Sequence, residues 1–260
     1  MSRFVHLAVH SHYSMMRGTA SPEDLGAAAM RLGITTLALT DTDGVYGLVR
    51  FWEVAKAAGI RPILGVEVRG NVASAICLVE TDAGYANLCQ LLSRKHREPE
   101  FRLDAGFDRT GLVILTSSVA LLRVLAAQSG ARDLYLALTA GHTPAAEPTH
   151  SLARLREARA LGILPVAVGD VHFLAPGDWE MHRLLRAIAL NTTRDRVPAC
   201  ELAPRGAWLR SPAEVEGFFS FCPEAVENTA RLAERCAREE PPWGRVVFPP
   251  FQGGGPAPGG

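Results

Sequence analysis

The order of hydrophobic and polar positions predicts strands and helices that alternate along the whole chain. Short runs of branched and aliphatic residues are typical of buried strands, whereas apolar residues three or four positions apart are typical of amphipathic helices. We predict strands over residues 4–9, 36–40, 62–68, 73–79, 112–116, 134–139 and 165–168. We expect helices over residues 25–32, 46–58, 83–93, 119–128, 151–161, 178–189 and 223–239. Repeated strand–helix units favour one α/β domain, either a parallel barrel or a wound sheet.

The strongest helix start is the segment Ser21-Pro22-Glu23-Asp24. Serine suits the capping position, proline suits the first helical position, and acidic residues suit the positive end of the helix dipole. Residues 94–109 are basic and irregular, so we interpret them as a surface loop. We assign residues 1–240 to one domain and residues 241–260, rich in Pro and Gly, to an exit segment that is disordered at its end.

Composition narrows the possible partners and compartments. The 27 basic and 27 acidic residues cancel, so no overall field recruits nucleic acid or an anionic membrane. The five cysteines are odd in number and show no paired spacing, which favours reduced thiols in the cytoplasm. No apolar run is long enough to span a bilayer. We therefore expect a cytoplasmic protein without a membrane partner.

One dense basic run, residues 94–97, could contact a nucleic-acid backbone. The alternative is a solvated helix end, where cations interact favourably with the helix dipole. We favour the second interpretation, so we expect DNA to bind only indirectly or weakly.

Candidate chemistry gathers where the predicted strands end. His10 and His12 follow the first strand, and alternation along a strand would place both on one face. The later strand ends contribute the remaining acidic and imidazole side chains, Asp41, Glu67, Asp170 and His172. Imidazoles and carboxylates that converge from separate strands suit divalent ions such as Zn²⁺ or Mn²⁺. Each could instead cap a loop, but four strand ends together favour a metal site.

Several stretches, in this order, resemble the PHP (polymerase and histidinol phosphatase) domain. They are FVHLAVHSHYS, LALTDTDGVYGLVRF, AAGIRPILGVEV, DAGYANLCQLLS and VAVGDVHFL. More narrowly, the chain is similar to the version that opens the α subunit of bacterial DNA polymerase III. The later stretches WLRSPAEVEGFF and CPEAVENTARLAERC resemble the segment that leads toward the polymerase's catalytic region. The residues of two stretches, TDTDGVYG and GDVHFLAPGDWEMHRLLRAI, resemble the error-prone branch used in damage tolerance more than the replicative branch.

The resemblance implies a distorted seven-stranded (β/α) barrel with a trinuclear metal site that hydrolyses phosphoesters. It also shows which ligands this chain has lost. The family's ligand positions fall on five residues that are poor ligands or none: Ala8, Arg17, Thr42, Ser74 and Ser118. Four positions are kept: His10, Glu67, Asp170 and His172. These could hold one residual ion, with Asp41 and His12 as weaker candidates.

Two functions follow from this comparison of ligand positions. The first is a structural and interaction scaffold with an eroded metal site, one that has lost most of its ligands, partnered by a polymerase core of the α-subunit type. In that case the cofactor is none, or one Zn or Mn ion. The second is a residual metal-dependent phosphoesterase; a histidinol-phosphatase-like enzyme would need the same missing ligands. We also expect the guanidinium of Arg17 to replace a metal ion by pairing with Glu67 or Asp170.

Overall fold

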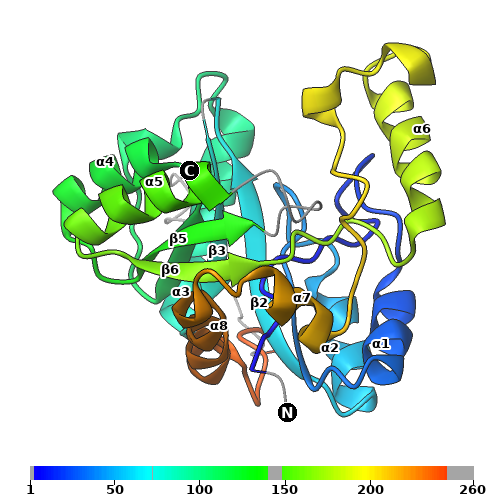
Figure 1. Cartoon of the computed structure of the whole chain (residues 1–260), viewed down its shortest axis with the longest axis horizontal. Coiled ribbons are helices and arrows are strands. Elements are labelled where there is room, and N and C mark those ends of the chain that lie inside the picture. The colour runs from blue at the N-terminus through cyan, green and yellow to red at the C-terminus, as the bar shows by residue number, and fades with distance from the viewer. Residues whose placement is uncertain (1–2, 72, 140–147, 245–260) are drawn as a thin grey trace, which may run out of the picture.

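The computed structural model describes residues 3–71, 73–139 and 148–244, and it shows a curled sheet surrounded by helices (Figure 1). The six strands are β1 (Thr36–Leu39), β2 (Arg61–Arg69), β3 (Ser74–Val79), β4 (Leu112–Thr116), β5 (Leu134–Thr139) and β6 (Leu164–Val168). The helices are α1 (Pro22–Arg31), α2 (Leu48–Ala57), α3 (Asp82–Arg97), α4 (Val119–Ser129), α5 (Pro148–Ala160), α6 (Trp179–Ala189), α7 (Pro212–Phe218) and α8 (Pro223–Cys236). The predicted α/β class is confirmed.

The strands lie in the sheet in the same order as in the sequence, from β1 to β6. β1 pairs with β2 in parallel, and so do β4 with β5 and β5 with β6. β3 runs antiparallel to both of its neighbours. The expectation of a fully parallel sheet is therefore wrong at β3, where a short connection replaces the crossover helix that a parallel pair needs.

The predicted first strand, residues 4–9, forms no continuous ladder among the described residues. It instead makes isolated parallel bridges on two sides, His6 with Leu37 of β1 and Val9 with Val171 beyond β6. Backbone hydrogen bonds support both bridges, such as Ala38 N to His6 O at 3.0 Å and Val171 N to Ala8 O at 3.0 Å. The described ranges thus contain six strands where the sequence predicts seven, and residues 4–9 bridge to β1 on one side and to the segment beyond β6 on the other.

The curled sheet is buried on both faces. Alternate residues of a strand enter different cores: in β4, Leu112 and Ile114 join the outer core, while Val113 and Leu115 join the inner one. The inner core also includes Leu232 of α8, so this helix packs on the inner side of the curled sheet. Burial on two faces explains why the strands are continuous apolar runs rather than alternating ones.

The helix ends confirm one local prediction and correct another. Ser21 caps α1 and forms a capping box with Asp24, with Pro22 at the first helical position. The basic residues 94–97 form the last turn of α3, so the surface loop predicted for this part is wrong, and the helix-end interpretation holds. The remainder of that loop contains a short 3-10 turn, Leu103–Ala105.

The end of the described chain packs back on the body. The Trp243 ring contacts Trp52 of α2 and Tyr85 of α3, with centroids 6.0 and 5.7 Å apart. The predicted disorder concerns residues 245–260, which lie outside the described residues. All five cysteines are free, and no helix in the described ranges has the length and hydropathy to cross a bilayer.

Candidate functional site

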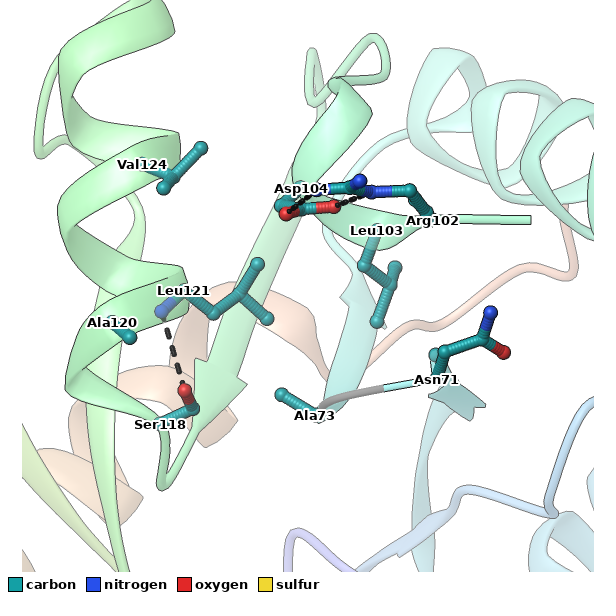
Figure 2. Close-up of a pocket in the computed structure, with 10 residues that line it drawn as sticks. Asn71, Ala73, Arg102, Leu103, Asp104, Ser118, Ala120, Leu121 and Val124 are labelled. Carbon is teal, nitrogen blue, oxygen red and sulfur yellow. Dashed lines mark hydrogen bonds and ion pairs between the residues drawn. The ribbon is translucent and has the colours of Figure 1, made fainter. Parts of the chain in front are cut away.

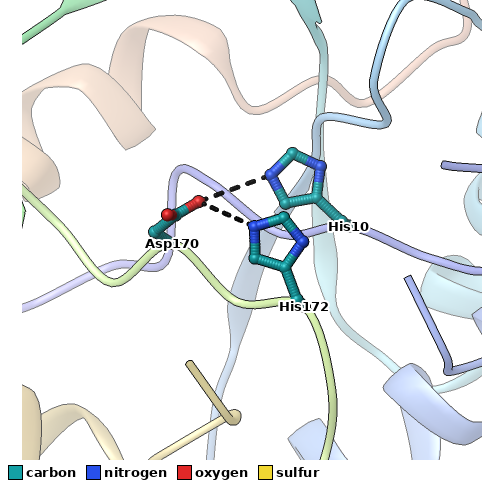
Figure 3. A group of neighbouring side chains, drawn as sticks. All are labelled: His10, Asp170 and His172. Atoms are coloured by element: carbon teal, nitrogen blue, oxygen red, sulfur yellow. Dashed lines mark ion pairs between the residues drawn. The ribbon is translucent and has the colours of Figure 1, made fainter. Parts of the chain in front are cut away.

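Three of the predicted ligands meet in one place, and Figure 3 shows that their polar atoms face one another. The Oδ1 atom of Asp170 lies 3.5 Å from Nε2 of His10 and 3.3 Å from Nε2 of His172. The two imidazole rings are stacked, with centroids 4.2 Å apart and planes 13° apart. The three ligand atoms lie within 4.8 Å of one another.

Two neighbouring segments deliver these side chains. His10 follows residues 4–9, and its N–H donates to the carbonyl of Val171 at 2.8 Å. Asp170 and His172 flank Val171 just beyond β6, and Asp170 adopts a left-handed backbone conformation with φ of 47°. The bridge between Val9 and Val171 therefore holds the two segments in register.

The electrostatics of the group follow from burial and charge. Burial alone would lower the pKa of His10, but the hydrogen bond to Asp170 and the charges of Glu67, Asp170 and Asp41 raise it above its ordinary value. Burial would raise the pKa of Asp170, yet His172 and His10 hold that pKa well below its ordinary range. The Asp170 side chain remains 33% exposed, so the group is open to solvent on one side.

Glu67 lies near this group but outside it. It lines the same pocket of about 330 Å³ as Asp170 and His172. Its Oε2 atom accepts a hydrogen bond from the Thr42 hydroxyl at 3.2 Å. At Thr42, predicted to stand where the family has an imidazole, a hydroxyl therefore holds the Glu67 carboxylate.

Asp41 is buried in a network of serines. Its Oδ1 accepts from Ser11 N and from the Ser14 hydroxyl, both at 2.7 Å, and its Oδ2 accepts from the Ser11 hydroxyl at 2.8 Å. These bonds direct both carboxylate oxygens toward the segment that follows His10. Asp41 is not one of the three residues whose ligand atoms converge.

His12 does not share a face with His10, contrary to the expectation from strand alternation. The chain turns at His12, and its side chain is exposed and packs edge-on against the Tyr13 ring, 4.5 Å between centroids. Alternation fails here because the extended segment has already ended.

The predicted pairing of Arg17 with Glu67 or Asp170 is wrong. Its guanidinium lines the same pocket, but Nη2 donates to Oε2 of Glu201 at 3.2 Å. The same oxygen accepts from Nη2 of Arg186 at 2.6 Å, and both arginine side chains are mostly buried. Glu201 is therefore the shared ion-pair partner of Arg17, at a predicted former ligand position, and of Arg186.

The other departures from the family pattern have structural roles. Ala8 is fully buried in the inner core. Ser118 caps α4 by accepting from Leu121 N at 3.2 Å, and Figure 2 shows it at one end of a small apolar pocket of about 100 Å³. Ser74 lines the pocket beside Asp170, and its carbonyl accepts from the Thr116 hydroxyl at 2.6 Å.

Sequence reasoning missed Glu201 and His182. The buried His182 ring bridges two backbone groups: Nδ1 donates to the Arg17 carbonyl at 2.7 Å, and Nε2 accepts from Ala203 N at 2.9 Å. Burial, followed by the nearby charges, lowers the pKa of His182 to about 4. Because Arg17 and Glu201 lie far apart in sequence, no local pattern could have paired them.

The group His10, Asp170 and His172 fits one divalent ion. Two imidazole nitrogens and one carboxylate oxygen form a donor set that suits Zn²⁺ or Mn²⁺. Such an ion would supply Lewis acidity toward a phosphate oxygen. Among the described residues this is the one convergent cluster of metal-ligating side chains, and its donor set accounts for a single ion.

Comparison with known proteins gives the family. A PHP domain model matches residues 6–160. The chain is 30% identical to DNA polymerase III subunit alpha of Escherichia coli (strain K12) over 265 residues, covering 90% of this chain and 23% of that protein. It is 33% identical to the error-prone DNA polymerase of Mycobacterium tuberculosis (strain ATCC 25618 / H37Rv) over 272 residues, covering 90% and 24%. The chain spans about a quarter of the length of these relatives.

Among solved structures, a candidate metal-dependent phosphoesterase from Bifidobacterium adolescentis shares 14% identity at a TM-score of 0.44, covering 65% of this chain and 87% of that one. A score this low carries no argument about function. The family match extends over more than half of the sequence and agrees with the polymerase relatives. The chain therefore belongs to the PHP domain family.

Proposed function

We propose that this chain is the PHP module of a bacterial polymerase of the DNA polymerase III α type, in the error-prone branch, and that it serves as a structural and interaction scaffold. Its relatives are DNA polymerases about four times as long. The residues of two motifs, TDTDGVYG and GDVHFLAPGDWEMHRLLRAI, support the error-prone assignment. In this role the module supports repair or translesion synthesis by a polymerase core that it contacts.

The observation that carries this proposal is how the loops at the strand ends are held together. Protein side chains make the connections: Asp41 binds the segment after His10, and Glu201 joins Arg17 to Arg186. His182 ties the Arg17 carbonyl to Ala203. Since these contacts need no ion, the fold persists after most of the metal ligands have been lost.

Binding to the polymerase core tests the scaffold role. The chain is mixed with the separately purified core of an α-type polymerase from the same source, and binding is measured by calorimetry and by the thermal stability of the core. We expect a complex and a more stable core. If neither binding nor stabilisation occurs, the scaffold proposal is wrong.

The convergence of His10, Asp170 and His172 beside an open pocket favours a second candidate, a residual metal-dependent phosphoesterase. In this case an ion held by these residues would act on a phosphodiester in the pocket. Hydrolysis of a generic phosphodiester in added Mn²⁺ by the wild-type chain, lost in the Asp170→Asn variant, would support it. The scaffold role predicts no turnover above the background.

A further inference from the structure

His10 is supported from behind by a buried hydroxyl. Its Nε2 atom faces Asp170, whereas its Nδ1 atom lies 3.3 Å from the hydroxyl oxygen of Ser14. That oxygen lies 2.7 Å from Oδ1 of Asp41. The side chains of His10, Ser14 and Asp41 are all buried, so water does not compete for these contacts.

The direction of each hydrogen bond follows from the neighbouring backbone groups. The N–H of Thr42 donates to the Ser14 oxygen at 3.0 Å, so the Ser14 hydrogen points elsewhere. Asp41 is within reach, and it accepts two further bonds, from the N–H and the hydroxyl of Ser11, as a carboxylate without a hydrogen does. The Ser14 hydroxyl therefore donates to Asp41.

This arrangement determines the tautomer of His10. The Ser14 oxygen has given its hydrogen to Asp41 and has one lone pair left beside the Thr42 bond. It can only accept from Nδ1, so Nδ1 carries the hydrogen. In the protonated ring both nitrogens donate, Nε2 to Asp170 and Nδ1 to Ser14. The Ser14 contact is the shorter of the two, 3.3 against 3.5 Å, so the neutral ring keeps its hydrogen on Nδ1 and Nε2 presents its lone pair toward Asp170 and His172.

We propose that Ser14 and Asp41 are positioning residues that hold His10 in the tautomer able to bind a cation through Nε2. The inference rests on the residual ion site proposed above, and it changes the expected role of Asp41 from ligand to support. Hydrogen-bonded partners of this kind orient the imidazoles of metal sites in general. Among the described residues, His172 has no such partner, because its Nδ1 atom is buried without a hydrogen bond. His10 is thus the better oriented of the two imidazoles.

The test compares the full chain with its Ser14→Ala variant. Nitrogen-15 NMR of histidine-labelled, metal-free protein at about pH 9, where imidazoles are generally neutral, reports the tautomer of His10. We expect the Nδ1–H form in the wild type and a mixture or the Nε2–H form in Ser14→Ala. Titration with Zn²⁺ should show an affinity about 10- to 100-fold weaker in the variant.

Two further variants separate positioning from general loss of structure. Ser11→Ala removes another hydroxyl that donates to Asp41, whereas the ring of His10 contacts Ser14, so the tautomer should stay Nδ1–H. Ser118→Ala removes a helix cap elsewhere, so it controls for a loss of stability. An Nε2–H tautomer in the wild type, or an unchanged tautomer and Zn²⁺ affinity in Ser14→Ala, would overturn the proposal.

Failure of the ion site and failure of the positioning role would give different results. If the wild-type chain binds no Zn²⁺, the residual ion site is wrong. The tautomer measurement uses metal-free protein, so it still decides whether Ser14 and Asp41 set the protonation of His10.

Discussion

His6 illustrates how a single buried residue sets a pH response in this fold. Its Nε2 atom donates to the carbonyl of Arg210 at 2.9 Å, while its Nδ1 atom is buried without a partner in the described part of the chain. Burial lowers the pKa of His6 to about 4, and the bond to Arg210 opposes this only in part. The folded chain therefore keeps His6 neutral at pH values where the unfolded chain protonates it.

Acidification should therefore destabilise the protein through His6. Between the ordinary pKa of 6.5 and the folded pKa of about 4, the unfolded state binds the proton more readily, so stability falls as pH falls. Urea unfolding at pH 7 and pH 5 measures this change in the free energy of unfolding. We expect the His6→Gln variant to lose on the order of 1–2 kcal/mol less than the wild type over this range. Equal losses in both proteins would contradict the assignment.

Gly18 is required by a close approach of two backbone segments. A Cβ atom at this position would lie 2.0 Å from the carbonyl oxygen of Ser11, within the loop that presents His10. Gly18→Ala should force this loop apart and lower the free energy of unfolding by about 1–3 kcal/mol. Thermal unfolding measures the loss.

The matched control for this substitution is Gly217→Ala in α7. No atom lies within 4 Å of a Cβ built at Gly217, so alanine should be neutral or stabilise the helix by up to about 1 kcal/mol. If the Gly18→Ala variant is as stable as the Gly217→Ala variant, the inference of a close backbone contact in the His10 loop is wrong.

Some site residues could be found from sequence and others could not. His10, Asp170 and His172 were predicted because each follows an apolar strand-like run, and strand ends meet at one edge of a sheet. His12 was misplaced because no residue pattern marks where the extended segment turns. Glu201 was missed because its partner Arg17 is distant in the chain.

At the level of elements, α6 stands apart from the sheet (Figure 1) and is joined to the site by polar contacts. Arg186 of α6 shares the Oε2 atom of Glu201 with Arg17, and its side chain is only 7% exposed. Replacing the carboxylate would leave a buried guanidinium without its charge partner. Removing one partner of a buried ion pair strongly lowers the free energy of unfolding, whereas removing one partner of an exposed pair has little effect.

We therefore expect Glu201→Gln to lower the free energy of unfolding by about 1–3 kcal/mol. Chemical denaturation measures this loss. The control is Glu157→Gln. The Glu157 carboxylate lies 3.4 Å from the guanidinium of Arg123, whose side chain is 63% exposed, so this substitution should leave the free energy of unfolding unchanged. Equal stability of the two variants would show that Glu201 does not hold α6 to the loop after His10.

The elements themselves were predicted better than their pairing. Local signals such as the Ser21–Asp24 capping box define α1, and they depend only on neighbouring residues. The antiparallel direction of β3 could not be predicted, because a strand's apolar pattern is the same in either direction. Residues 4–9 have a strand-like pattern but only isolated bridges, since they contact two different segments in turn.

At the level of the whole molecule, contacts between protein groups hold together the inner core and the loops at the strand ends of the PHP fold. α8 packs on the inner side of the sheet through Leu232, Ala233 and Cys236. At the site, Thr42 and Arg17, which are predicted from the sequence to replace ligands of the family, make hydrogen bonds to other side chains. We therefore expect a stable domain that binds no more than one ion.

The stoichiometry of Zn²⁺ tests this requirement most directly. The chelator-treated chain is reloaded with Zn²⁺, freed of excess metal and assayed by elemental mass spectrometry. We predict at most one Zn²⁺ per chain, lost in Asp170→Ala and kept in His12→Ala, because His12 is exposed and lies outside the cluster. Two or more ions per chain, or a bound ion that survives Asp170→Ala, would contradict the account.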